Sequence, residues 1–300
     1  MTTMQTTANG IDITYEDKGP RDAPVILLVM GLGGQLTLWP DEFVDALNAH
    51  GFRTIRYDNR DVGLSTRFEA AGVPNLKWMF VKAALRLPVR PAYTLADMAA
   101  DGVALLDHLG IERAHIVGAS MGGMISQHIA ARYSDRTLSL TSIMSTTGNP
   151  RLPRANKDAM AVLANRPMSG DPEAMIAYSV RAARVIGSPA YPAEEERLQR
   201  RVRGDFERGW YPQGVARQMA AIVADGDRRA MLKTIAAPTL VIHGEADPLV
   251  PLAGGKDTAA SIPGARLMTI PGIGHDLPLA LVDTLADAIA GHARELAAAA

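Results

Sequence analysis

The segment Gly118-Ala119-Ser120-Met121-Gly122 is the most informative stretch of the sequence. It lies between a short apolar run, residues 115–118, which predicts a strand, and residues 121–133, which predict a helix. A serine at such a turn is typical of a nucleophile elbow, which is so tight that the residues two before and two after the serine must lack side chains. Gly118 and Gly122 meet this requirement. The pattern also arises by chance in glycine-rich chains, but its position between strand and helix favours Ser120 as a nucleophile.

Segments on both sides of this turn alternate between strand and helix patterns. The continuous apolar run from Val25 to Met30 predicts a strand that is buried on both faces. Apolar and polar residues alternate around the turn-forming pair Asn9-Gly10, which predicts a β-hairpin. We therefore predict an α/β fold with a mostly parallel, doubly wound sheet and helices on both faces. The other predicted strands cover residues 52–57, 138–144, 239–243 and 265–270, and the other predicted helices cover residues 40–49, 95–109 and 278–296.

A long segment interrupts this alternation. Residues 147–227 contain no convincing strand but several helical patches, such as residues 173–184 and 194–202. We predict that residues 147–227 form an inserted helical cap, or lid. The core would then consist of residues 1–146 and 228–300.

A second, shorter insertion covers residues 72–93. Apolar side chains form two stripes along its predicted helix, residues 75–87, and leave only Lys77, Lys82 and Arg86 to face water. No acidic residue occurs between Glu69 and Asp97. We expect this helix to pack under the cap and form one wall of the substrate entrance. A dimer contact and a helix lying on a membrane surface are the alternatives.

Composition and charge exclude several classes of protein. Of 300 residues, 31 are Lys or Arg and 32 are Asp or Glu, so the formal charge of -1 gives no reason to bind a nucleic-acid backbone. The absence of cysteine excludes disulfides, thiolate catalysis and thiolate-bound metals. The apolar run near the N-terminus is far shorter than the ~20 residues of a membrane-spanning helix, and no signal peptide is visible. We expect a cytoplasmic protein.

A serine nucleophile needs a base and a group that orients the base, and in this arrangement the chain order is serine, acid, histidine. Asp247 follows the predicted strand at residues 239–243, and His275 follows the one at residues 265–270. Both therefore lie at carboxyl ends of strands, where such sheets place their sites. We predict that Asp247 orients His275 and that His275 takes the proton of Ser120.

Other residues compete for these roles. Glu245 is the alternative acid, although the sequence Asp247-Pro-Leu-Val-Pro251 fits the acid loop better. The remaining histidines are expected to serve other purposes. We expect His243 to be a structural hydrogen-bonding group. We expect His128 to point away from the elbow and His115 to lie far from the carboxyl end of its strand. The last three are expected at the surface near helix ends, namely His50, His108 and His292.

Backbone N–H groups should stabilise the oxyanion. One is expected from Met121, directly after the nucleophile, and the other from the loop after the strand at residues 25–30, with Leu32 as the best candidate. The glycines of that loop could be mistaken for a phosphate-binding loop. They lack the third glycine of G-x-G-x-x-G, and no Gly-Lys-Ser/Thr follows, so a cofactor is not expected there.

With these motifs in order, the chain resembles an α/β-hydrolase fold enzyme over essentially its whole length. The resemblance implies that the cap lies between the sixth and seventh core strands, and that Arg60 ties loops together. Most of this superfamily has His-Gly where this chain has Met30-Gly31, but the aclacinomycin methylesterase group of serine esterases also has Met-Gly. Four stretches are similar to that group, namely residues 28–31 (LVMG), 39–43 (WPDEF), 55–65 (IRYDNRDVGLS) and 113–118 (RAHIVG).

We therefore expect a serine hydrolase that cleaves a carboxylic ester through an acyl-enzyme, without a metal or organic cofactor. Haloalkane dehalogenases and epoxide hydrolases use Asp as nucleophile and are excluded. The alternatives are a carbon–carbon bond hydrolase or a cofactor-free perhydrolase with the same triad, and a small-molecule receptor on the same fold.

The expected partner is a medium-sized, largely apolar ester. The sequence does not decide whether the protein forms a homodimer. The candidate substrate-binding residues are Trp78 and Phe80 in the insertion and Tyr178 and Trp210 in the cap. Further cap residues that could line the pocket are Met160, Met168, Met175, Tyr211 and Met219.

Overall fold

The computed structural model describes residues 3–297 except 86, 166 and 168–169. Its centre is one eight-stranded sheet with strand order β1-β2-β4-β3-β5-β6-β7-β8. The first two strands run antiparallel to their neighbours, and the other six are parallel, as the alternating sequence pattern predicts. The strands are β1 (Met4–Ala8), β2 (Ile11–Lys18), β3 (Val25–Val29), β4 (Arg53–Tyr57), β5 (Ala114–Ala119), β6 (Thr137–Ile143), β7 (Thr239–Gly244) and β8 (Arg266–Ile270).

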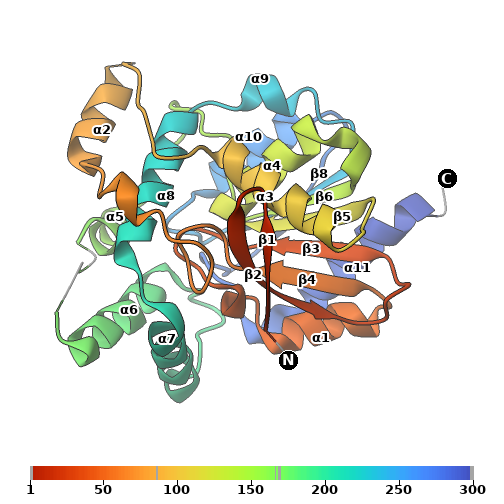
Figure 1. The fold of residues 1–300 in the computed structure, drawn as a ribbon, viewed down its shortest axis with the longest axis horizontal. Coiled ribbons are helices and arrows are strands. Elements are labelled where there is room, and N and C mark those ends of the chain that lie inside the picture. Colours follow the sequence, from red (N-terminus) through yellow and green to blue (C-terminus); the bar gives the residue numbers. More distant parts are fainter. Residues whose placement is uncertain (1–2, 86, 166, 168–169, 298–300) are drawn as a thin grey trace.

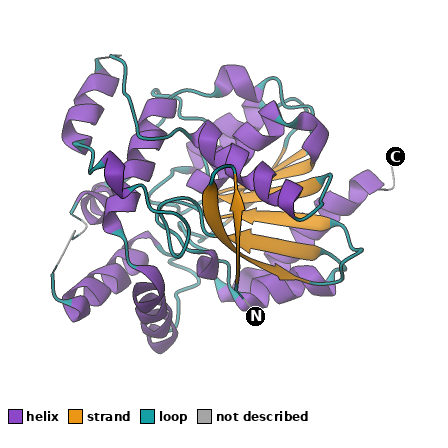
Figure 2. Ribbon diagram, viewed as in Figure 1, coloured by secondary structure: helices purple, strands orange, loops and turns teal. Residues whose placement is uncertain are grey.

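Helices cover both faces of the sheet, which confirms the predicted doubly wound α/β fold (Figures 1 and 2). On one face, α1 (Asp41–Ala49) and α11 (Val282–Ala297) pack against each other over a core that includes Leu28 and Ile242. On the other face, α3 (Leu95–His108) and α4 (Met121–Arg132) enclose a core that includes Leu27 and Ile116. The central strands are thus buried on both sides, as their continuous apolar sequences require.

The segment between β6 and β7 is almost wholly helical. It contains α5 (Lys157–Ala164), α6 (Pro172–Ile186), α7 (Glu195–Gly209), α8 (Pro212–Asp225) and the short α9 (Arg229–Leu232). In Figure 1, α5 to α8 lie on the left of the sheet, where the arrowheads of β3 and β4 point. The division of the chain into a cap, residues 147–227, and a core stays a prediction.

The short insertion carries α2 (Leu76–Ala84), close to the predicted residues 75–87. It packs against α8, with Met79 as the one side chain buried among the described residues of the helix. In Figure 1 it stands at the periphery of the molecule. Among the described residues, no helix has the length and apolar character needed to cross a membrane.

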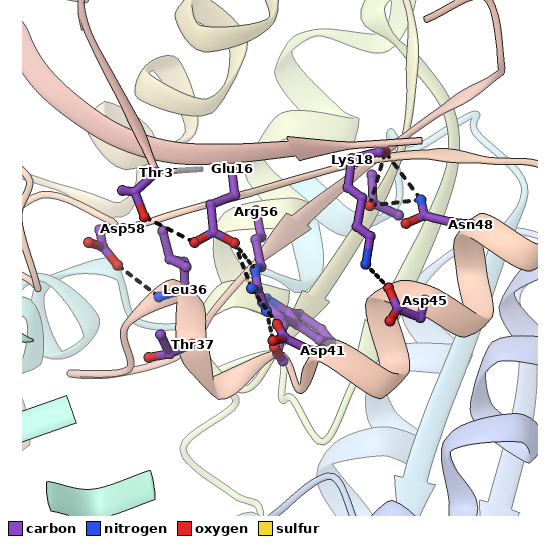
Figure 3. Close-up of polar contacts among 12 residues, drawn as sticks. Thr3, Glu16, Lys18, Leu36, Thr37, Asp41, Asp45, Asn48, Arg56 and Asp58 are labelled. Carbon is purple, nitrogen blue, oxygen red and sulfur yellow. Dashed lines mark hydrogen bonds and ion pairs between the residues drawn. The ribbon is translucent and has the colours of Figure 1, made fainter. Parts of the chain in front are cut away.

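A buried ion pair fixes the antiparallel edge of the sheet (Figure 3). Arg56 on β4 donates to Glu16 on β2 over 2.6 and 2.9 Å, and to Asp41, the first residue of α1, over 2.6 Å. The neighbouring Asp58 accepts a 2.7 Å hydrogen bond from the backbone N–H of Leu36. The loop after β3 is therefore tied to the loop after β4, close to where the predicted oxyanion N–H groups lie.

The sequence did not predict α10 (Leu252–Ser261) between β7 and β8. Its sequence contains the pair Gly254-Gly255, which disfavours a helix when read in isolation. The reason for the glycine is tertiary, because a Cβ at position 255 would lie 2.5 Å from Nδ1 of the His243 ring. Close packing against β7 therefore overrides local helix propensity.

Candidate active site

Ser120 lies at the turn between β5 and α4 with a φ of +56° and a ψ of -120°. Such a positive φ is uncommon for a residue with a side chain and marks local strain. A Cβ on Gly118 would overlap the carbonyl oxygen of Gly122, and one on Gly122 would overlap that of Val29. Both glycines are therefore required by close backbone packing, as the elbow interpretation expected.

The His275 ring lies between Ser120 and a carboxylate. Its Nε2 is 2.9 Å from Ser120 Oγ, and its Nδ1 is 2.7 Å from Asp247 Oδ2. Because a carboxylate only accepts hydrogen bonds, it favours the tautomer with the proton on Nδ1, and Nε2 is then free to accept the serine proton. The structure thus brings the three predicted triad residues into one hydrogen-bonded chain.

Asp247 is buried and has its own supports. Its Oδ1 accepts hydrogen bonds from the backbone N–H groups of Leu249 and Val250, at 2.9 and 2.8 Å. The competing acid Glu245 is exposed and accepts a hydrogen bond from Thr269 Oγ1 instead. The geometry favours Asp247 as the residue that orients the base.

The other histidines have different partners. His243 Nε2 lies 2.8 Å from the carbonyl oxygen of Val250, and burial lowers the pKa of this histidine. His128 pairs with Asp225 at 2.8 Å, and His115 contacts Ser139. The expectation that His292 lies at the surface is wrong. It is buried because α11 turns it towards the carbonyl oxygen of Pro238, at 3.2 Å.

The two predicted oxyanion donors flank the nucleophile. Met121 is the first residue of α4, and the N–H groups of a first helical turn have no carbonyl partner within the helix. On the other side, a Cβ on Gly31 would lie 3.0 Å from Ser120 Cβ, so the backbone leading to Leu32 runs beside the serine. The assignment of these N–H groups to an oxyanion hole stays a prediction.

Two helices of the segment between β6 and β7 hold the loops that carry these groups. The side chain of Gln218 on α8 accepts a 2.8 Å hydrogen bond from the N–H of Gly33 and donates to the carbonyl of Arg60. At the end of α6, the carbonyl of Ile186 accepts a 2.7 Å hydrogen bond from the N–H of His275. Neither contact could be predicted from the sequence, because both join segments far apart in the chain and neither residue belongs to a recognisable motif.

A buried arginine connects α8 to two loops that follow β4. Arg217 on α8 forms two hydrogen bonds with Asp61, at 2.7 and 2.8 Å, and one with the carbonyl of Gly72 at the start of the short insertion. Tyr93 OH also donates to Asp61. Arg60 pairs with Asp101 and thus joins the loop after β4 to helix α3, whereas the resemblance implied a tie between loops.

The four candidate substrate-binding residues lie in different settings. On α2, Trp78 is 54% exposed and Phe80 is 48% exposed. Tyr178 on α6 donates a 2.6 Å hydrogen bond to the carbonyl of Val162, and the Trp210 ring packs on Phe206. Their part in binding substrate stays a prediction, and Met168 lies outside the described residues.

Among the residues that the structure describes, no group of three or more His, Asp or Glu side chains is arranged to hold a metal ion.

Known proteins resemble this chain over nearly its whole length. Residues 24–279 match the model of the alpha/beta hydrolase fold family. A rhodomycin D methylesterase of Streptomyces sp. (strain C5) is 30% identical, over 98% of this chain and 99% of the relative. A bifunctional esterase/perhydrolase of Acinetobacter calcoaceticus is 28% identical, over 93% of this chain and 95% of the relative. The crystal structure of a hydrolase from Pseudomonas aeruginosa PA01 superposes with a TM-score of 0.69, at 28% identity over 98% of both chains.

Proposed function

We propose that this chain, which belongs to the α/β-hydrolase fold family, is a serine hydrolase that cleaves carboxylic esters through an acyl-enzyme. The observation that carries the proposal is the hydrogen-bonded chain from Ser120 through His275 to Asp247. The methylesterase at 30% identity supports ester cleavage as the reaction.

The geometry supports a two-step reaction. In the first step, Ser120 Oγ attacks the ester carbonyl carbon while its proton moves to His275 Nε2. The imidazolium is stabilised by Asp247, and it returns the proton to the departing alkoxide, so that an alcohol leaves and an acyl-serine remains. In the second step, water gives one proton to His275 and its OH group to the acyl carbon. The bond from the acyl carbon to Ser120 Oγ then breaks, and His275 passes its proton to Oγ, which releases the acid and restores Ser120.

The negative charge on the substrate oxygen develops in both steps. The N–H groups of Met121 and Leu32 are the proposed donors to this oxygen. Rigid, pre-aimed donors act strongly at such a site because they need no reorganisation when charge develops, and losing one typically costs about 10²–10³ in rate. The hydrogen bond from Gly33 to Gln218 holds the loop that carries Leu32.

The proposed substrate is a small-molecule ester of medium size and largely apolar character. The cap, proposed as residues 147–227, supplies apolar side chains such as Tyr178 and Trp210 for this selection. A cytoplasmic location belongs to the same set of proposals, and the oligomeric state stays open between a monomer and a homodimer.

Hydrolysis of p-nitrophenyl acetate tests this function. We expect a steady rate of p-nitrophenol release that continues well beyond one equivalent of protein. A single burst of one equivalent followed by no release would identify a receptor that acylates without turnover, and would contradict the proposal.

Perhydrolysis is a second candidate, favoured by the relative from Acinetobacter calcoaceticus. In that reaction hydrogen peroxide replaces water as the nucleophile that attacks the acyl-serine, and a peracid leaves. The ratio of peracid to acid, measured at increasing peroxide with a fixed ester, separates the two reactions. Peracid that exceeds the acid at millimolar peroxide would favour the second candidate.

A further inference from the structure

The short insertion concentrates the exposed apolar surface of the molecule. Ten large apolar side chains are exposed among the described residues, and six of them lie between positions 73 and 87. Scattered single residues of this kind are ordinary, whereas a contiguous group marks an interaction site. Three of the six, Trp78, Val81 and Leu85, lie at helical spacing along one side of α2 and the residue that follows it, and we refer to these three as the α2 face. The other three are Val73, Phe80 and Leu87.

The position of α2 directs this face away from the core. Met79 is the buried side chain of the helix, and the contact of α2 is with α8. The helix lies at the outer edge of the molecule (Figure 1). Leu85 is 64% exposed and Trp78 is 54% exposed, so their rings and methyl groups meet solvent in the isolated protein. The described residues of the chain leave this surface in contact with water.

Every charged residue between positions 70 and 96 is basic. Lys77 is exposed, and Lys82 Nζ lies 5.7 Å from the centre of the Trp78 ring. Arg90 is also exposed, and the sequence contains no acidic residue between Glu69 and Asp97. The chain as a whole is nearly neutral, with a formal charge of -1, so this local excess is specific to the insertion.

An anionic lipid surface fits this combination better than a second copy of the chain. In a two-fold dimer, the same patch would face itself and bring Lys77 and Lys82 against their own copies. A membrane interface offers negative headgroups to the lysines and an apolar layer to the aromatic and aliphatic side chains. We propose that the α2 face docks the protein reversibly on an anionic lipid surface.

Docking involves none of the triad residues, so it can be tested independently of ester hydrolysis. The natural reporter is Trp78, because Trp39 is fully buried and Trp210 is half-buried. Full-length protein is mixed with vesicles of phosphatidylcholine alone or with added phosphatidylglycerol. Binding is read by co-sedimentation and by the tryptophan emission maximum.

We expect co-sedimentation and a shift of emission to shorter wavelength with the anionic vesicles only. Replacing both lysines (Lys77→Gln with Lys82→Gln) should lower the partition about 25-fold at low salt, because each basic residue near an anionic surface contributes about fivefold. Val81→Ser with Leu85→Ser should abolish binding while leaving p-nitrophenyl acetate turnover unchanged. Leu267→Ser, at an exposed leucine on the edge strand β8, is the matched control and should bind as the unaltered protein does.

Three results would overturn the proposal. One is the absence of binding to anionic vesicles by folded protein. Another is a dimer in solution that Val81→Ser with Leu85→Ser converts to monomer, which would identify a second copy as the occupant. The third is that the unaltered protein does not bind vesicles and Val81→Ser with Leu85→Ser changes the ester chain-length preference. This result would place α2 at the substrate entrance.

Discussion

The side-chain oxygen of Gln218, on helix α8, accepts a hydrogen bond of 2.8 Å from the backbone N–H of Gly33. Gln218 is fully buried, and its amide nitrogen donates to the carbonyl of Arg60. Gly33 directly follows Leu32, which carries a proposed oxyanion donor. Helix α8 therefore takes part in setting the position of the loop beside Ser120.

Removing this acceptor should weaken catalysis more than substrate binding. Gln218→Met keeps the volume of the side chain but leaves the Gly33 N–H without its partner. We expect kcat to fall about tenfold to a hundredfold with little change in KM, because small misplacements of catalytic groups cost about 10² in rate. Steady-state kinetics measure this. Gln213→Ala, on the same helix, is the control, and equal effects of the two variants would contradict the positioning role.

The acid loop offers a matched pair of carboxylates. Asp247 contacts His275, whereas Glu245 faces Thr269. Asp247→Asn should lower kcat about 10⁴-fold, as expected when the orienting carboxylate is lost and the wrong tautomer forms. Glu245→Gln should have little effect. The reverse order in the kinetics would place the acid at position 245.

The buried pair of Arg217 and Asp61 should contribute strongly to stability. Both side chains are almost fully buried, so Arg217→Met would leave the charge of Asp61 without compensation. Loss of one partner of a buried pair typically lowers the free energy of unfolding by about 3–5 kcal/mol. The exposed pair of Arg203 and Glu173 on the cap is the control, and Arg203→Met should change the stability little. Urea unfolding curves measure both, and a loss in Arg217→Met no larger than in the control would contradict this account.

Acid should destabilise the protein through His115. Burial, with help from the charges of His292 and Arg113, lowers the pKa of His115 from 6.5 to about 4. Between these values the unfolded chain binds a proton that the folded protein does not, so stability falls as the pH falls from 6.5 to 4, by about 3 kcal/mol in all. His115→Gln should reduce this slope. Unfolding curves at several pH values measure it, and an unchanged slope would assign the acid sensitivity to other groups.

Most of the sheet and of the elbow could be predicted from the sequence because their signals are local. The apolar run of β3 and the spacing of Gly118, Ser120 and Gly122 follow from backbone sterics within a few residues. The helix α10 could not be predicted, since Gly255 is there to fit the ring of His243. For the same reason, no local pattern indicated that Gln218 and Ile186 hold the loops that carry Leu32 and His275.

The outward position of the α2 face could not be predicted from the sequence either. Its two apolar stripes indicated burial, and we expected a wall of the substrate entrance. In the structure the helix packs against α8, buries Met79 and leaves Trp78 and Phe80 about half exposed, and its part in the substrate entrance stays a prediction. Hydrophobic periodicity shows that a helix has apolar faces, but not how many of them the rest of the chain covers.

The central claim is that Ser120 is the nucleophile of a turnover enzyme. Its most direct test is peptide mass spectrometry after treatment with a serine-directed fluorophosphonate, combined with p-nitrophenyl acetate turnover before and after labelling. We expect one adduct per chain, located on Ser120, with loss of turnover in proportion to labelling and no labelling of Ser120→Ala. An enzyme that has lost its nucleophile keeps far less than a hundredth of its turnover. The claim would therefore be contradicted by an adduct on another residue, or by a Ser120→Ala protein that keeps more than about a hundredth of the turnover.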